Sequence, residues 1–238
     1  MKFGLLVCVL SFWYVGLRAQ ENTVLDSLKS QLKIDLEDTA RFKVLLQLHQ
    51  EFIRTDTTLS LEYLSKAIDL SENNDYTDLW AQALLKKINY HWKHANLPMA
   101  EEALKQVEEL LPKVSQTKVK ATYFMEKGLV HYQKSEYDNA AAEFFQASDF
   151  YRQLQDTMGV IKCFSNIGIC YWELENQDEA LDFYLKAMDL QKQIDDDLAL
   201  SRLYGNIGLV YRAKGDNKKA LEYYLQSLEI NRKNGYEG

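Results

Sequence analysis

A chain of 238 residues is long enough to bury a large core or to build a stack of repeats. Hydrophobic residues make up 47% of it, which excludes disorder over the whole length, and two prolines with ten glycines are too few for a fold rich in strands and tight turns, so the composition predicts an all-helical protein. The net charge of −7 argues against nucleic acid as the main partner, because a phosphate backbone needs a concentrated basic surface.

The chain begins like an exported protein. Lys2 is followed by an apolar run over residues 3–17 and then by Arg18, Ala19 and Gln20. A basic start, a short apolar stretch and a small residue at the exit predict a secretory signal peptide over residues 1–19 and a periplasmic or other extracytoplasmic location. The alternative is an uncleaved anchor that tethers the chain to the membrane, although a spanning helix needs ~20 apolar residues. No second such stretch follows, so we expect no membrane insertion of the mature segment.

Residues 20–40 are expected to form a lead-in helix, and a repeat begins at Arg41. The segment 164–171, Phe-Ser-Asn-Ile-Gly-Ile-Cys-Tyr, recurs as Tyr-Gly-Asn-Ile-Gly-Leu-Val-Tyr at 204–211, a shift of 204 − 164 = 40 residues. The segment 179–187 recurs at 219–227 with the same shift. Stepping back by this distance predicts five units, at about 41–80, 81–120, 121–160, 161–200 and 201–238.

Each unit is expected to contain two helices joined by a short polar turn, because apolar residues recur at helical spacing on both sides of it. A glycine stands in the middle of the first helix, where it costs about 1 kcal/mol relative to alanine, so a neighbouring helix is expected to approach closely there. An alanine on the second helix serves the same end, and an aromatic residue one turn later is expected to fill the gap between units. These repeat positions are Gly128, Gly168, Gly208, Ala140, Ala180, Ala220, Phe144, Tyr184 and Tyr224, with Tyr171 and Tyr211 ending the first-helix pattern.

This combination of aromatic, Gly and Tyr on the first helix, with Ala, aromatic and small residue on the second, resembles the tetratricopeptide repeat (TPR). The resemblance covers residues 41–238 and implies an all-α fold: a right-handed α-solenoid of antiparallel helix pairs, the TPR superhelix, with about five repeats. It also implies a concave groove that binds a protein or peptide. The period of 40 exceeds the usual ~34 of the family, and His91 and His131 replace the Tyr of the last two units.

The order of signal peptide, lead-in and repeats is also similar to the extracytoplasmic half of bacterial sensor proteins. In those proteins a kinase, cyclase or DNA-binding output domain follows the repeats. Residues 234–238 occupy the place of the segments that lead into a new first helix at 155–159 and 195–198. A solenoid normally closes with a polar capping helix, so we expect the chain to be truncated at its C-terminus.

Asparagines of the resembled family bind the backbone of an extended peptide, and Asn166 and Asn206 occupy that register here. An amide both donates and accepts hydrogen bonds, so it can pair with a peptide of any sequence. Lys162 and Arg202 lie four residues earlier on the same face and could bind a ligand carboxylate. The alternative is that the asparagines satisfy neighbouring backbone and that the two basic residues form a solvated face.

Two further positions in register, Trp172 and Arg212, are expected to flank this groove. Unit three has Glu126 and unit two has Lys86 where the later units have asparagine. The predicted asparagine ladder therefore has two rungs.

No pattern indicates an enzyme, since the sequence has neither a phosphate-binding Gly-rich loop nor a nucleophile elbow. His91 and His94 lie three residues apart without a third ligand at a metalloprotease spacing, so no metal or other cofactor is expected. Cys163 and Cys170 are seven apart on one predicted helix, with Cα atoms ~10 Å apart, which is too far for a disulfide and indicates buried thiols.

The predicted function is a non-enzymatic scaffold that binds a protein or peptide outside the cytoplasm, with a sensory role in a larger signalling protein as its extension. The alternatives are a structural module that self-associates, and the N-terminal portion of a sensor kinase, cyclase or transcriptional regulator that carries its catalysis or DNA binding elsewhere.

Overall fold

The computed structural model describes residues 24–194 and 196–235, and the predicted signal peptide lies outside them. A short helix covers residues 24–31. The helices that follow are α2 (Asp38–Phe52), α3 (Thr57–Asn73), α4 (Thr77–Lys93), α5 (Leu97–Leu110), α6 (Thr117–Gln133), α7 (Tyr137–Gln153), α8 (Thr157–Glu173), α9 (Gln177–Gln191), α10 (Asp197–Ala213) and α11 (Asn217–Asn234). The described residues contain no strand, which confirms the predicted all-α class. Across these same residues, no helix combines the length and the apolar character that crossing a bilayer requires.

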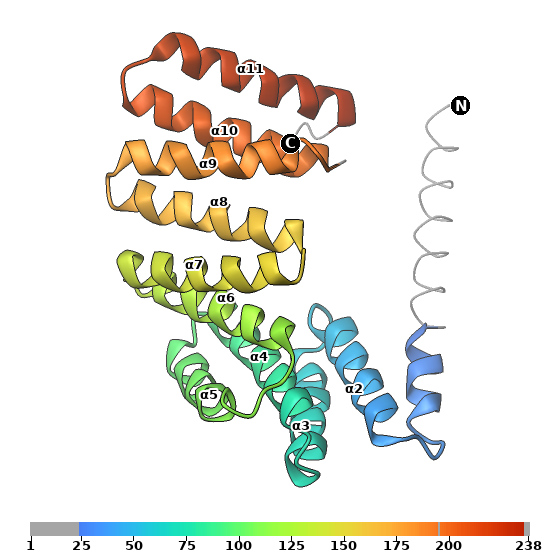
Figure 1. The fold of residues 1–238 in the computed structure, drawn as a ribbon. Coiled ribbons are helices and arrows are strands. Elements are labelled where there is room, and N and C mark those ends of the chain that lie inside the picture. Colours follow the sequence, from blue (N-terminus) through green and yellow to red (C-terminus); the bar gives the residue numbers. More distant parts are fainter. Residues whose placement is uncertain (1–23, 195, 236–238) are drawn as a thin grey trace, which may run out of the picture. The chain divides into compact units, whose positions relative to one another are not determined.

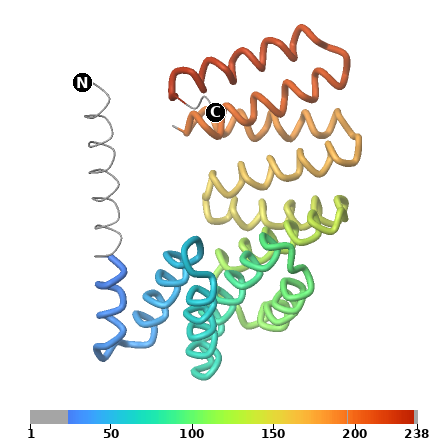
Figure 2. The backbone as a smooth tube through the Cα atoms, turned by 180° about the vertical axis from the view of Figure 1, so that it is seen from behind, coloured from blue at the N-terminus to red at the C-terminus, as the bar shows by residue number. Residues whose placement is uncertain are grey.

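The described residues divide into two compact units, one ending at Lys86 and one beginning at Lys87. In the first unit α2 packs on α3, and the buried residues Leu48, Leu64 and Leu28 share one core. In the second unit α6 to α11 follow one another as antiparallel pairs (Figure 1), and the view from behind shows the same order (Figure 2). Its core runs without interruption from α6 to α10. The predicted solenoid of antiparallel helix pairs is confirmed.

The first helices α6, α8 and α10 each pack one glycine against an aromatic ring. A Cβ atom added to Gly168 would lie 2.7 Å from two ring carbons of Tyr184. The closest approach is 2.6 Å in the equivalent pairs, Gly128 with Phe144 and Gly208 with Tyr224. The rings therefore lie against the glycine of their own helix pair, whereas the sequence led us to expect them between units. The second-helix alanines are buried as well: Ala140, Ala180 and Ala220.

Most of the helix-to-helix turns share one backbone geometry. The N–H of Asn176 donates to the carbonyl of Tyr171 at 2.9 Å, and Glu175 between them has a φ of 56°. This arrangement is a Schellman motif, in which a left-handed residue ends the helix. The left-handed residue is glycine in one such turn, Gly215, and in the others it is Asp75, Ala95, Ser135, Gln155 or Glu175. Each non-glycine residue in this conformation costs about 1–2 kcal/mol, so these turns carry strain that sequence composition conceals.

Replacing Glu175 by glycine should relieve this strain. We expect Glu175→Gly to raise the free energy of unfolding of the second unit by about 0.5–1 kcal/mol, because its side chain is exposed and glycine adopts positive φ freely. Gly215→Ala is the matched control and should have the opposite sign. The added Cβ would meet no atom within 4 Å, so only the positive φ of the backbone opposes the change. We expect the free energy of unfolding to fall by about 1 kcal/mol. Urea denaturation followed by circular dichroism measures both, and shifts of the same sign would contradict the account.

Candidate functional site

Helix α8 presents two distinct faces. The cap residue Asp156 begins the helix by accepting a hydrogen bond from the Gly159 N–H at 2.9 Å. Lys162, Asn166 and Ile169 follow at spacings of four and three residues, which places them on one face. Lys162 is exposed, and the other two are half-buried. The predicted groove residues of α8 therefore do share one accessible surface.

Helix α10 repeats this surface in register. The Asp196 carboxylate caps it by accepting from the Ala199 N–H at 3.0 Å. Arg202 is exposed, Asn206 is half-buried and Leu209 is 37% exposed. We call these six residues the first-helix face: Lys162, Asn166, Ile169, Arg202, Asn206 and Leu209. It carries a basic row, an amide row and an apolar row.

The two asparagine side chains do not serve the neighbouring backbone. The Asn166 amide nitrogen donates to the Met125 sulfur at 3.5 Å, and a thioether is a weak acceptor. Within the described part of the chain, the Asn206 side chain has no hydrogen-bond partner. The hydrogen-bonding capacity of both amides is therefore almost wholly unused, which argues against the purely structural alternative.

Asn166 also borders a small depression between α6 and α8. It has a volume of about 100 Å³, and Leu129, Tyr132, Phe144 and Ile169 line it with Asn166. An apolar floor beside an amide suits one small side chain of an extended ligand. The depression thus gives the amide row an adjacent apolar seat.

Glu126 occupies the register position of the asparagines in α6, but its carboxylate is engaged within the chain. It is only 8% exposed and accepts hydrogen bonds from Asn89 Nδ2 at 2.9 Å and from Trp92 Nε1 at 2.7 Å. Sequence spacing singles out Glu126 but not its partners Asn89 and Trp92, because they lie more than 30 residues away in the chain. Lys86, the remaining register position, is exposed in the other unit.

The two residues expected to flank the groove differ in environment. Trp172 is half-buried and packs against the core of the second unit, and Arg212 is exposed near the end of α10. Trp172 therefore contributes to packing, and Arg212 alone of the two is fully available to a ligand.

The reactive side chains of the second unit lie in unreactive settings. Burial raises the pKa of the Cys163 and Cys170 thiols to about 12, so both stay protonated and poorly nucleophilic at neutral pH. Burial lowers the pKa of His91, and the ring of His94 contacts the Tyr90 carbonyl at 2.7 Å. Across residues 24–194 and 196–235, no three His, Cys, Asp or Glu side chains group to hold a metal ion.

Tetratricopeptide-repeat models match residues 85–153, 120–193 and 165–233, which together extend over more than half of the chain. No curated protein matches the chain. Among solved structures, BtubC from P. vanneervenii is 17% identical with a TM-score of 0.79, covering 92% of each chain. A putative kinesin light chain from Podosopora anserina is 12% identical with a TM-score of 0.67, covering 84% of this chain and 99% of that one.

A third similar structure is a signal-transduction ATPase with a tetratricopeptide-repeat sensor from Pyrococcus horikoshii. It is 16% identical with a TM-score of 0.72, and the match covers 80% of this chain but 29% of the ATPase. The TM-scores of these three structures show a shared fold, and the repeat models add the sequence pattern itself. The chain belongs to the tetratricopeptide-repeat family.

Proposed function

We propose that the chain is a non-enzymatic scaffold that binds an extended peptide segment of a partner protein on its first-helix face. The repeat family supports a role in protein interaction. The observation that carries the finer proposal is the unused amide capacity of Asn166 and Asn206, because half-buried amides that make at most one weak internal hydrogen bond suit a ligand's backbone.

The three rows of the face suggest which peptide fits. Lys162 and Arg202 favour an acidic side chain, while the exposed Leu209 and the depression beside Asn166 favour an apolar one. A peptide in which acidic and apolar side chains alternate could place both on their rows while its backbone meets the amides. We therefore propose an acidic, partly apolar peptide as the ligand class.

The proposed location is outside the cytoplasm, and the proposed wider role is sensory. The basic start and short apolar run at the N-terminus support export. A tetratricopeptide-repeat sensor in the signal-transduction ATPase shows that this fold can be coupled to signalling in another protein. Fusion of residues 1–40 to a reporter enzyme active only after export tests the location, and a reporter that stays inactive would contradict it.

The groove is tested by selecting peptides from a random displayed library on the purified chain. We expect Asn166→Ala combined with Asn206→Ala to weaken the selected peptides at least tenfold, or about 1.4 kcal/mol, because the backbone loses both amide contacts. The matched control is Asp182→Ala combined with Glu222→Ala, two exposed second-helix residues in the same register. Titration calorimetry measures each affinity. Equal affinity for wild type and the asparagine variant would refute the groove.

Self-association is a second candidate, favoured by one observation on α11. Leu221, Leu225 and Leu228 lie on one face of this helix and are 58%, 53% and 40% exposed. A second copy of the chain would bury this stripe against its own in a closed two-fold pair. Light scattering should then show a concentration-dependent dimer that Leu225→Lys abolishes. A wild-type chain that stays monomeric at high concentration would rule this candidate out.

A further inference from the structure

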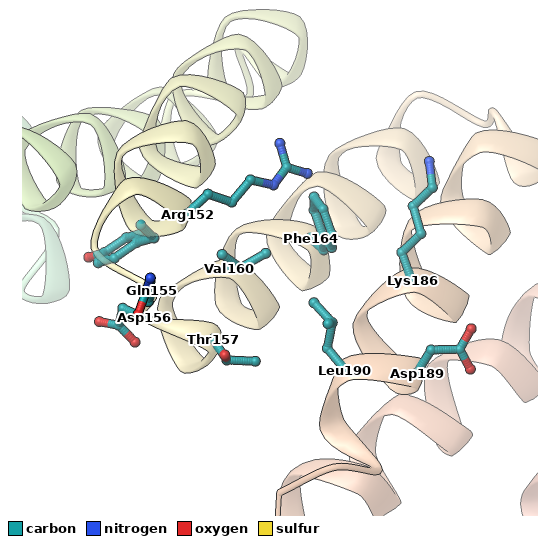
Figure 3. Close-up of a pocket in the computed structure, with 10 residues that line it drawn as sticks. Arg152, Gln155, Asp156, Thr157, Val160, Phe164, Lys186, Asp189 and Leu190 are labelled. Atoms are coloured by element: carbon teal, nitrogen blue, oxygen red, sulfur yellow. The ribbon is translucent and has the colours of Figure 1, made fainter.

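A second cavity lies on the opposite side of α8 from Lys162 and Asn166. It opens between α7, α8 and α9, with a volume of about 480 Å³, and Val160, Phe164 and Leu190 provide its apolar surface (Figure 3). Phe164 lies two residues from both Lys162 and Asn166, which turns it about 200° around the helix from them. The cavity is within the size range of small-molecule sites and is separate from the first-helix face.

The repeat pattern changes beside this cavity. In the preceding helix pair, Phe150 stacks on Phe124 with ring centroids 5.5 Å apart and planes within 9° of parallel. Phe164 is the register equivalent of Phe124, but Leu190 stands where Phe150 stood. Leucine has no ring to stack on Phe164, so the ring-on-ring contact of the preceding pair is absent beside this cavity.

Two cations border this space. The guanidinium carbon of Arg152 lies 5.3 Å from the Phe164 ring centroid, and Lys186 extends on the other side of Phe164 (Figure 3). Arg152 pairs with Asp149 at 3.0 Å and Lys186 with Asp182 at 2.6 Å. All four side chains are at least half exposed, and exposed pairs of this kind are weak, so a ligand anion can compete for either cation.

The neighbouring helix pairs lack the positive charge of Lys186, although the first unit has Lys66 at the same register position beside another cavity. The register equivalents of Lys186 in the neighbouring pairs are Gln146 and Gln226. Two acidic residues, Asp156 and Asp189, also line the cavity, but Asp156 is already engaged as the cap of α8. Figure 3 shows both acids at the end away from the Arg152 guanidinium and the Lys186 ammonium. The cavity thus has its two cations at one end and its two acids at the other.

We propose that this cavity is a binding site for a one-ring aromatic carboxylate. The ligand's ring occupies the position that Phe150 fills in the preceding pair, and it packs on Phe164 and Leu190. The carboxylate lies at the end with the two cations, where it pairs with the Arg152 guanidinium and the Lys186 ammonium. The site does not depend on peptide binding at the first-helix face.

Three probes separate the contribution of the ring to affinity from that of the charge: 3-phenylpropionate, its uncharged amide and phenethylamine. Saturation-transfer NMR titrations on the full chain should show 3-phenylpropionate binding in about the millimolar range, as expected for a ligand of this size. We expect the amide to bind at least threefold more weakly and phenethylamine more weakly still. Leu190→Phe, which restores the ring of the preceding pair, should weaken 3-phenylpropionate at least tenfold.

Lys186→Gln supplies an independent test, because this exposed residue can be changed without disturbing the core. It should weaken 3-phenylpropionate about threefold and leave the amide unaffected. Circular dichroism melting of Leu190→Phe checks that its fold is retained. The proposal is overturned if wild type binds none of the probes up to about 10 mM, if Lys186→Gln leaves the carboxylate affinity unchanged, or if phenethylamine binds as tightly as 3-phenylpropionate.

Discussion

Gly168→Ala should destabilise the second unit by about 2 kcal/mol, although alanine is the better helix former. The added methyl group would lie 2.7 Å from the Tyr184 ring, and that ring is only 3% exposed, so it has no free space into which to move. A contact this short places the overpacking cost near the upper end of its usual range, about 3 kcal/mol, and the gain of about 1 kcal/mol in helix propensity leaves a net loss of about 2 kcal/mol. Urea denaturation monitored by circular dichroism measures the change.

Gly205→Ala is the matched control. Gly205 also lies in the middle of a first helix, but a Cβ at this position would meet no atom within 4 Å. Only the higher helix propensity of alanine then contributes, so this change should stabilise the protein by about 0.5–1 kcal/mol. Combining Gly168→Ala with Tyr184→Leu should cost less than the sum of the two single changes, since the smaller side chain leaves room for the methyl group. If Gly168→Ala proved as harmless as Gly205→Ala, close helix approach could not explain the repeated glycine.

The fold could be predicted because its determinants are local and repeated. Helical periodicity and a shift of 40 residues fix the helix pairs, and the small residue at Gly168 marks the close approach. The sequence did not reveal which aromatic ring contacts the glycine, because the contact with Tyr184 depends on the crossing of two helices. The backbone geometry of the turns could not be predicted either, since residues such as Glu175 adopt positive φ at positions where glycine is normally expected.

The candidate site could be predicted only as a set of residues in register. Sequence spacing places Lys162 and Asn166 on one face, but it cannot tell whether an amide is already hydrogen-bonded. That question is decided by partners on other helices, as the carboxylate of Glu126 shows. The cavity beside Phe164 could not be predicted for the same reason, because residues of α7, α8 and α9 line it together.

Glu126→Ala should destabilise the second unit by about 2–4 kcal/mol. The substitution removes the acceptor of Asn89 Nδ2 and Trp92 Nε1, and these partly buried donors would be left without their carboxylate. Leaving buried donors unsatisfied costs about 1–3 kcal/mol each, and bonds to a charged group are the stronger ones. Glu126→Gln keeps one acceptor oxygen and should lose about half as much. Denaturation followed by circular dichroism measures the change in stability.

Asn166→Ala and Asn206→Ala provide the comparison at the same register position. Their side chains have almost no partners within the described chain, so each should change stability by less than about 0.5 kcal/mol. One repeat position would then serve two purposes: in α6 a carboxylate holds neighbouring side chains, and in α8 and α10 an amide remains available to a ligand. If all three alanine variants lost stability equally, the asparagines would be structural, and the binding role proposed for the first-helix face would lose its physical basis.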